Sequence, residues 1–377
     1  MKREDLGEGR MSILNRAPEN VRAIAPYVPG KPIAETAREL GLREADILKM
    51  ASNENPLGSS PKAIAAIRGA LNDLAYYPDG SGFDLKNVLA RRFGMAPANL
   101  VLGNGSNDVL ELTARAFLTR DDSVVYSRHG FMVYPLVTQA IGARAIEVPT
   151  RGFETDLDGM ERAIRPDTKI VFVANPNNPT GTFTPWAQLR AFIERVPQNV
   201  LVVVDEAYGE YLAPELQSPA VAWVARFSNL VLSRTLSKAY GLAGLRVGYG
   251  VAHPDVAELM NRVRQPFNVN HLAMVAACAA LDDLEFIARS RDNNTAGLKQ
   301  LAAGFERLGL AYIPSFANFI TVRVGDAAAV YAKLLAAGII VRPIANYGMP
   351  EYLRVTVGLP GHNARFLAAL EAALARG

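Results

Sequence analysis

Through its middle, this chain alternates short apolar segments with helical stretches, and that pattern constrains its fold more than any other feature. Four segments have the composition of buried strands, at 124–126, 170–174, 201–204 and 230–232. Continuous apolar strands suit a sheet that helices cover on both faces, because neither face then meets water. The alternation therefore predicts a mostly parallel α/β sheet, whose carboxyl edge gathers the polar residues that follow the strands.

The length of 377 residues predicts two domains rather than one small core. In the last third, the pattern predicts one long helical stretch over about 256–289, followed by strands at 317–324 and 353–358. These features indicate a smaller α+β domain after the sheet. The expected divisions are an N-terminal arm with a short helix over 1–45, a large cofactor-binding domain over 46–270 and a small domain over 271–377.

Charge and cysteine content exclude several classes of protein. Lys and Arg exceed Asp and Glu by only 40 − 37 = 3 and are scattered along the chain, so we expect neither a nucleic-acid nor a membrane partner. The single cysteine, Cys278, excludes an intramolecular disulfide and fits a reducing compartment. No run reaches the ~18 to 20 apolar residues of a membrane span. We expect a cytoplasmic protein without a metal site.

The most informative segment surrounds Lys238. Thr235 and Ser237 precede this lysine, and Arg246 follows it. A lysine amine attacks carbonyl groups only when it is neutral, and neighbouring hydroxyl and arginine groups can favour that state while also binding a phosphate. The segment therefore predicts a phosphate clamp around a nucleophilic lysine. A strand end followed by a surface lysine is the alternative.

Two polar segments follow predicted strands directly. Asn178 lies in the loop 175–181, which two prolines and a glycine restrain and whose amides suit hydrogen bonding to a phenolic or ring oxygen. Asp205 ends the apolar strand 201–204. A buried carboxylate there requires a cation, and a protonated pyridine nitrogen would serve.

A glycine-containing loop at 103–107 precedes a predicted helix at 109–117. Backbone N–H groups at a helix N-terminus bind phosphate well, although a simple helix cap at Ser106 or Asn107 is the alternative. A nucleotide-binding dehydrogenase would also place glycines at a helix start. However, the third glycine of its fingerprint is missing here, and that class explains none of the other segments.

Together these segments resemble the fold-type I pyridoxal-phosphate-dependent aminotransferases, specifically the histidinol-phosphate aminotransferase group. The resemblance implies a mostly parallel sheet of the seven-stranded type, pyridoxal 5′-phosphate as the cofactor and a homodimer. It covers nearly the whole chain, and its most specific marks are the segments 26–32, 51–56, 175–181 and 205–208, Ser237-Lys238 with Arg246, and 353–358.

The resemblance assigns Lys238 to the Schiff base with the cofactor and, once freed, to proton transfer at the substrate. The amino donor would leave as a keto product, and the nitrogen would pass to a second keto acid, 2-oxoglutarate. The cofactor phosphate would be held by Gly105, Ser106, Asn107, Thr235, Ser237, Arg246 and, from the opposing subunit, Tyr77.

Further roles concern the cofactor ring. The resemblance implies that Asp205 pairs with the pyridinium nitrogen, while Asn178 and Tyr208 form hydrogen bonds with the ring O3′. Phe131 occupies a position where the family often has a tyrosine that stacks on the ring. Phe131 can stack but lacks a hydroxyl group, and His129 is a rival for the position.

On the substrate side, the resemblance implies that Arg354 receives the α-carboxylate, with Asn55 nearby. Arg342 matches a position that binds a substrate phosphate, and Tyr27 also matches a substrate-side position. These matches favour histidinol phosphate as the amino donor. A pocket for phenylalanine or tyrosine stays open as an alternative, with lining residues Tyr347, Phe131 and Phe319.

Two further classes of protein are compatible with this fold. A pyridoxal-phosphate decarboxylase acting on a phosphorylated amino acid would use nearly the same cofactor residues, because the fold does not decide the reaction. A non-enzymatic regulator would carry a DNA-binding module, for which the roughly 45 residues before the large domain leave little room.

Overall fold

A seven-stranded sheet forms the centre of the computed structural model, which describes residues 13–26 and 30–375. Strand β8 runs antiparallel to both of its neighbours, and the remaining pairs are parallel. The predicted mostly parallel α/β sheet is therefore confirmed. The order across the sheet is β2 (Leu100–Gly103), β8 (Gly248–Ala252), β7 (Leu230–Thr235), β6 (Leu201–Asp205), β5 (Thr168–Ala174), β3 (Ser123–Ser127) and β4 (Arg144–Val148).

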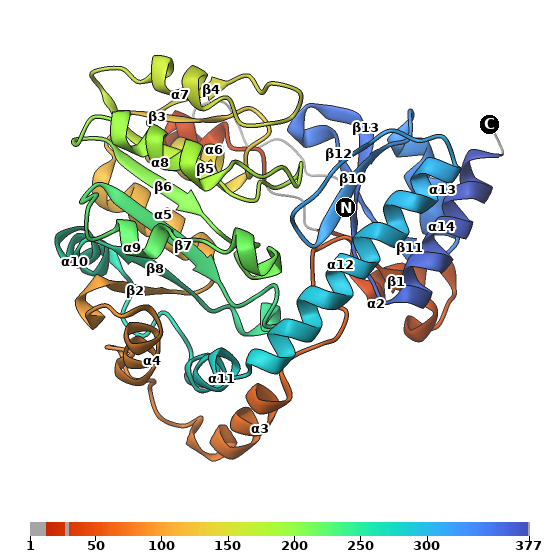
Figure 1. The fold of residues 1–377 in the computed structure, drawn as a ribbon, viewed down its shortest axis with the longest axis horizontal. Coiled ribbons are helices and arrows are strands. Elements are labelled where there is room, and N and C mark those ends of the chain that lie inside the picture. Colours follow the sequence, from red (N-terminus) through yellow and green to blue (C-terminus); the bar gives the residue numbers. More distant parts are fainter. Residues whose placement is uncertain (1–12, 27–29, 376–377) are drawn as a thin grey trace, which may run out of the picture.

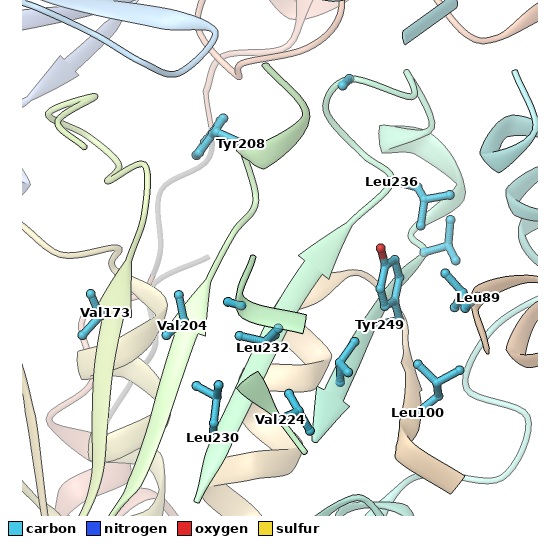
Figure 2. Packing of buried hydrophobic residues seen from close by; sticks show 14 of the residues in the cluster. Leu89, Leu100, Val173, Val204, Tyr208, Val224, Leu230, Leu232, Leu236 and Tyr249 are labelled. Carbon is cyan, nitrogen blue, oxygen red and sulfur yellow. The ribbon is translucent and has the colours of Figure 1, made fainter. Parts of the chain in front are cut away.

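Both faces of this sheet are buried, as its continuous apolar strands require. In β5, Ile170 and Phe172 belong to one core cluster, whereas Val171 and Val173 belong to another. Figure 2 shows Val173 in the same cluster as Val204 of β6 and Leu232 of β7. The first face is covered by α5 (Ser106–Phe117), α6 (Val133–Ile141) and α10 (Pro254–Val263). The second face is covered by α4 (Phe83–Phe93), α7 (Leu157–Ala163), α8 (Trp186–Arg195), α9 (Ala220–Trp223) and α11 (His271–Leu281).

A smaller α+β unit lies beside the large sheet (Figure 1). Its four-stranded antiparallel sheet has the order β12 (Arg342–Ile344), β13 (Met349–Thr356), β10 (Phe319–Arg323) and β9 (Tyr312–Ile313). Three helices accompany it, namely α12 (Leu284–Arg307), α13 (Ala327–Ala336) and α14 (Pro360–Leu374). Near the start of the chain, β1 (Leu48–Lys49) pairs in parallel with β11 (Ile339–Ile340). The arm before β1 contains α1 (Glu19–Arg22) and α2 (Ile33–Leu40), and α3 (Pro61–Ala70) follows it.

The single long helix predicted at 256–289 is wrong, because three helices, α10, α11 and α12, occupy this part of the chain. Pro266 lies in the break between α10 and α11, where it cannot donate a helical hydrogen bond. Asn270 then caps α11 by accepting a hydrogen bond from the backbone N–H of Ala273 at 2.8 Å. Asp283 caps α12 in the same way. These polar caps interrupt an apolar pattern that looked continuous.

Core packing favours domain boundaries other than 46 and 270. Ala277 in α11 and Phe286 at the start of α12 belong to the core of the large sheet. Leu301 and Phe305, farther along α12, pack in the core of the small unit, as does Leu48 of β1. Figure 1 shows α12 running from the large unit to the small one. We therefore propose that the large domain extends from about residue 52 into α12, and that the arm before it belongs with the small domain.

Among the described residues, no helix combines the length and the apolar character that crossing a membrane requires.

Candidate active site

A cavity of about 260 Å³ lies at the carboxyl edge of strands β5, β6 and β7, where β12 and β13 of the small unit face the large sheet. Open α/β sheets bind ligands at this edge. Most of the residues predicted for the site line this one cavity, although they come from distant parts of the chain. They are Ser106, Asn107, Phe131, Asn178, Asp205, Tyr208, Thr235, Ser237, Lys238, Arg246, Arg342 and Arg354.

Lys238 lies just beyond the end of β7, and its Nζ donates a hydrogen bond to the carbonyl oxygen of Ser52 at 2.9 Å. Burial, reinforced by the positive charges of Arg354 and Arg246, lowers the pKa of the Lys238 ammonium to about 7. A substantial fraction of this lysine is therefore neutral near pH 7. The alternative of an ordinary surface lysine does not apply.

Asp205 is buried at the end of β6. Its Oδ2 accepts a hydrogen bond from the hydroxyl group of Tyr134 at 3.1 Å, and its Oδ1 accepts one from the backbone N–H of Ala207 at 3.2 Å. Burial raises the pKa of this carboxyl to about 6, against the opposing effect of the two hydrogen bonds. Among the described residues, no Lys, Arg or His side chain forms an ion pair with it. The donor set around Asp205 thus fits a cationic ligand.

The loop before α5 has the geometry of an anion site. Gly105 is the N-cap of α5 and has φ 84°, and no side chain caps the first turn of the helix. The alternative of a side-chain cap at Ser106 or Asn107 is therefore excluded. A Cβ atom on Gly105 would lie 2.4 Å from Nη2 of Arg246, so only glycine lets this guanidinium approach the loop. Arg246 in turn donates to the Ser237 hydroxyl group at 3.3 Å.

Two arginines from neighbouring strands of the small sheet line the same cavity. Arg354 on β13 lies directly opposite Arg342 on β12 in the antiparallel ladder. Arg354 is buried and donates to Oδ1 of Asn178 at 2.6 Å and to the carbonyl oxygen of Ala51 at 2.8 Å. Like charges placed directly opposite each other repel, so this pair favours an anionic ligand between or above the two side chains.

Tyr208 completes the wall beside Lys238, and Figure 2 places it beyond the ends of the strands. Its hydroxyl group accepts a hydrogen bond from Nδ2 of Asn53 at 2.8 Å. Burial raises the pKa of Tyr208 to about 12, which keeps the phenol protonated and able to donate to a ligand oxygen. The tyrosine is therefore oriented by one bond and retains its own proton for another.

A model of the family described as "Aminotransferase class I and II" matches residues 45–370. The chain belongs to the class I and II aminotransferases. This assignment confirms the predicted enzyme class.

Individual aminotransferases are similar to this chain over nearly their whole length. Histidinol-phosphate aminotransferase 1 of Thiobacillus denitrificans is 60% identical over 359 residues, which cover 95% of this chain and 94% of the relative. Histidinol-phosphate aminotransferase of Methylobacillus flagellatus is 61% identical and covers 94% and 96%, respectively. The solved histidinol-phosphate aminotransferase of Sinorhizobium meliloti in complex with pyridoxal-5′-phosphate has a TM-score of 0.87 at 28% identity, and covers 96% of this chain and 98% of that one.

The cavity of this aminotransferase suits the predicted cofactor by its chemistry. Asp205 offers a carboxylate that lacks a cation, and the glycine loop with Arg246 offers donors to a phosphate. Lys238 offers an amine with a lowered pKa for a carbonyl carbon. Among the described residues, no group of three or more His, Cys, Asp or Glu side chains is arranged to hold a metal ion.

Asn55 and Tyr77 do not line the cavity of the described chain, and Gly105 adjoins it only through its contact with Arg246. The Asn55 side chain donates to the carbonyl oxygen of Ala239 at 2.9 Å and to the Ser290 hydroxyl group at 2.8 Å, so the structure does not place it beside Arg354. Tyr77 is 83% exposed and lies outside its own chain's cavity, as a residue directed at another subunit would. Tyr27 lies outside the described residues.

Phe131 and His129, the two candidates for stacking on the cofactor ring, lie in different surroundings. Phe131 lines the cavity and contacts Tyr134 edge to face, with ring centroids 6.0 Å apart. His129 is buried, and its Nδ1 lies 2.9 Å from the carbonyl oxygen of Tyr347. Because His129 does not line the cavity, the geometry favours Phe131. Of the aromatic residues expected around a substrate ring, Tyr347 lines the cavity, whereas Phe319 lies behind Tyr208.

Two site residues were missed by the sequence prediction. Asn53 donates to Tyr208 and has a φ of 56°, and it directly follows Ser52, whose carbonyl oxygen accepts from Lys238. It lies in the same motif as Asn55, and only the backbone geometry distinguishes the two asparagines. The hydroxyl group of Tyr134 reaches Asp205 across 71 residues of sequence, a contact that no local spacing indicates.

Proposed function

We propose that this chain is a pyridoxal-phosphate-dependent histidinol-phosphate aminotransferase, which transfers the amino group of L-histidinol phosphate to 2-oxoglutarate. The observation that carries this proposal is identity of 60% and 61% to histidinol-phosphate aminotransferases that share nearly the whole chain. The cavity supports it with two arginines, Arg342 and Arg354, placed opposite each other on β12 and β13. The products would be imidazole acetol phosphate and L-glutamate.

We assign the cofactor contacts as follows. The glycine loop, Thr235, Ser237 and Arg246 would hold the phosphate, and Asp205 would keep a proton on the ring nitrogen. Asn178 and Tyr208 would donate to the ring oxygen, and Phe131 would pack against the ring. When bound, pyridoxal phosphate supplies an electron-accepting ring that stabilises negative charge at the substrate Cα.

Lys238 acts at the substrate Cα as general base and acid. Its lowered pKa, about 7, puts the amine near the pH at which it both accepts and returns a proton readily. Tyr134 fixes the Asp205 carboxylate from behind, so that its charge faces the cavity. Buried surroundings exclude water from this proton transfer and strengthen the charge interactions.

The two arginines provide for two different anionic substrates. Histidinol phosphate presents one phosphate, whereas glutamate and 2-oxoglutarate present two carboxylates. Planar guanidinium groups bind both kinds of anion through paired hydrogen bonds. Arg354 is held in place by Asn178 and the Ala51 carbonyl group. We propose that Arg342 adds the second contact that a phosphate or a distal carboxylate requires.

We also propose a homodimer in which Tyr77 reaches the phosphate in the partner's cavity. Tyr77 is exposed, and exposed apolar residues such as Leu74, Tyr76 and Phe83 surround it in sequence. Exposed large apolar side chains gathered in one segment are typical of a subunit interface. A cytoplasmic location fits the free, half-buried Cys278.

The test of the substrate is a comparison of kcat/KM for histidinol phosphate, phenylalanine and tyrosine, because that ratio measures discrimination. We expect histidinol phosphate to be preferred. Arg342→Met should lower kcat/KM for histidinol phosphate by about 10- to 100-fold, since a charged hydrogen bond is lost, and should change the value for phenylalanine far less. Higher values for phenylalanine or tyrosine in the unaltered enzyme would instead identify an aromatic amino-acid aminotransferase.

A further inference from the structure

The turn that carries Tyr77 rests on a segment between α10 and α11, which we define as the cradle, residues Arg264–Asn268. The Tyr77 ring stacks on Phe267 of the cradle, with centroids 4.8 Å apart and planes inclined by 24°. Arg264 donates from Nη2 to the carbonyl oxygen of Gly80 at 2.9 Å. A Cβ atom on Gly80 would lie 3.2 Å from the Phe267 ring, so the turn and the cradle are in close contact.

The other side of the cradle is bonded to the glycine loop of the same chain. Asn268 donates from Nδ2 to Oδ2 of Asp108 at 2.7 Å and to the carbonyl oxygen of Leu102 at 3.0 Å. The same Asp108 oxygen accepts a hydrogen bond from the backbone N–H of Asn104 at 2.8 Å. Asp108 is thus bonded both to the loop that begins α5 and to the cradle.

A contact within the cradle joins these two sides. Arg264 donates from Nη1 to Oδ1 of Asn268 at 2.8 Å. A continuous chain of hydrogen bonds therefore runs from Gly80 through Arg264, Asn268 and Asp108 to Asn104. None of the cradle residues lines the cavity, so these contacts do not bind the ligand directly.

The cradle also holds a strained backbone. Phe267 has φ 56°, in the left-handed region that bulky side chains seldom adopt. Such a conformation persists only where the surroundings over-determine it, and it is concentrated at functional sites. Here the flanking hydrogen bond of Asn268 and the stack with Tyr77 hold Phe267 in place, although Phe267 itself is 43% exposed.

We propose that Arg264 and Asn268 are positioning residues that fix the Tyr77 turn relative to the glycine loop of their own chain. This inference rests on the proposed function, in which Tyr77 contacts the phosphate in the partner's cavity. The glycine loop serves one active site and Tyr77 serves the other. The cradle therefore links the phosphate contacts of the two sites through bonded groups with defined positions.

Mixed dimers test this link, because the effect is expected in the partner's site. One chain keeps Lys238, and the other carries Lys238→Ala, so only the first cavity gives the visible absorbance of lysine-bound pyridoxal phosphate. Arg264→Gln is placed either in the Lys238→Ala chain, whose Tyr77 serves the measured cavity, or in the chain that owns that cavity. Arg262→Gln is the matched control, since Arg262 lies two residues away in α10 and, among the described residues, forms its ion pair with exposed Glu258 alone.

We expect Arg264→Gln in the Lys238→Ala chain to weaken pyridoxal phosphate binding at the measured cavity by about three- to tenfold, through loss of a charged hydrogen bond to the turn. The same change in the cavity's own chain, and Arg262→Gln in either chain, should stay within about twofold. Asn268→Ala in the Lys238→Ala chain is a second variant and should weaken binding similarly. Sedimentation velocity checks that each variant pair is a dimer. The thermal midpoint of each pair is compared with that of the Arg262→Gln pair to detect a loss of stability.

Equal effects of Arg264→Gln and Arg262→Gln, or a larger effect in the cavity's own chain, would overturn the inference. Tyr77→Phe in the Lys238→Ala chain separates this result from a failure of the proposed function. If Tyr77→Phe weakens binding and neither cradle variant does, the positioning role alone is wrong. If Tyr77→Phe has no effect, the assignment of Tyr77 to the partner's phosphate is wrong, and the positioning role falls with it.

Discussion

Asp205 and Glu206 are adjacent buried carboxyl groups at the end of β6, yet their surroundings differ completely. Glu206 accepts hydrogen bonds from the guanidinium of Arg234 and from the Ser218 hydroxyl group, so its charge is paired. In the part of the chain that the structure describes, Asp205 accepts hydrogen bonds from the neutral donors Tyr134 and Ala207 alone. One carboxylate is therefore part of the fold's own structure, whereas the other has a buried charge that only a ligand can pair.

The basic side chains show the same contrast between charges that are paired with a neighbour and charges that are not. Arg234 pairs with Glu206, whereas neither Lys238 nor Arg354 forms an ion pair with an acidic side chain among the described residues. Lys238 and Arg354 line the cavity together with Asp205. Buried charges without partners cost free energy, so their concentration in one place indicates a site that is built for binding charged molecules. We therefore expect substitutions of the cavity residues to lower activity, and substitutions in the Glu206–Arg234 pair to lower stability.

The largest effect is expected on activity, when a residue that lines the cavity is replaced. Lys238→Ala should lower kcat by at least about 10³- to 10⁴-fold, because the variant lacks the group that moves the proton. Its unfolding free energy should fall little, since among the described residues the removed amine forms no ion pair and loses its hydrogen bond to the Ser52 carbonyl oxygen. Steady-state kinetics and urea unfolding measure the two quantities. Substantial remaining turnover would refute the role of Lys238.

The adjacent carboxylates give the sharpest test of the comparison. Glu206→Gln should lower the unfolding free energy by about 3 to 5 kcal/mol, because it leaves the guanidinium of Arg234 without its charge partner. Asp205→Asn should leave the stability of the cofactor-free protein unchanged or slightly higher at pH 8, while pyridoxal phosphate affinity and turnover fall sharply. If Glu206→Gln and Asp205→Asn lost the same amount of stability, the proposed difference between the two carboxylates would be wrong.

The smallest effect is a pH dependence. Folding lowers the pKa of Lys238 from 10.5 to about 7, so the folded state disfavours the ammonium form. The resulting destabilisation is complete below about pH 7 and disappears as the pH rises toward the unfolded pKa. The cofactor-free protein should therefore gain about 1 to 3 kcal/mol relative to Lys238→Met between pH 7 and 9.5, as measured by urea unfolding. A difference that is constant with pH would show that Lys238 titrates normally.

The site residues that could be predicted from sequence lie at or shortly after the end of an apolar strand. Asp205 is the last residue of β6 and Lys238 lies shortly after the end of β7, and parallel strands bring such residues to one edge. Asn53 could not be selected over Asn55, because its left-handed backbone is set by contacts with distant residues such as Thr356. The Tyr134 contact depends on how α6 lies over the sheet, where the Tyr134 ring stacks on Phe172 of β5, and local spacing does not reveal this.

The helix prediction failed for a related reason. Pro266 and the Asn270 cap separate α10 from α11, and Arg264 and Asn268 hold the segment between them by bonds to residues far away in the sequence. An apolar period continues across this break, so the pattern alone favoured one helix. The domain boundary predicted near residue 270 depended on the same pattern, whereas α11 packs in the core of the large sheet.

The sequence by itself determined the α/β sheet, the family and the residue types that the site requires, because apolar periodicity and strand-end motifs are local properties of the chain. The tertiary structure decided which of these residues are charged without a partner. Burial lowers the pKa of Lys238 and raises that of Asp205, and only packing establishes burial. It likewise decided that Tyr77 lies outside its own chain's cavity and that the cradle joins its turn to the glycine loop.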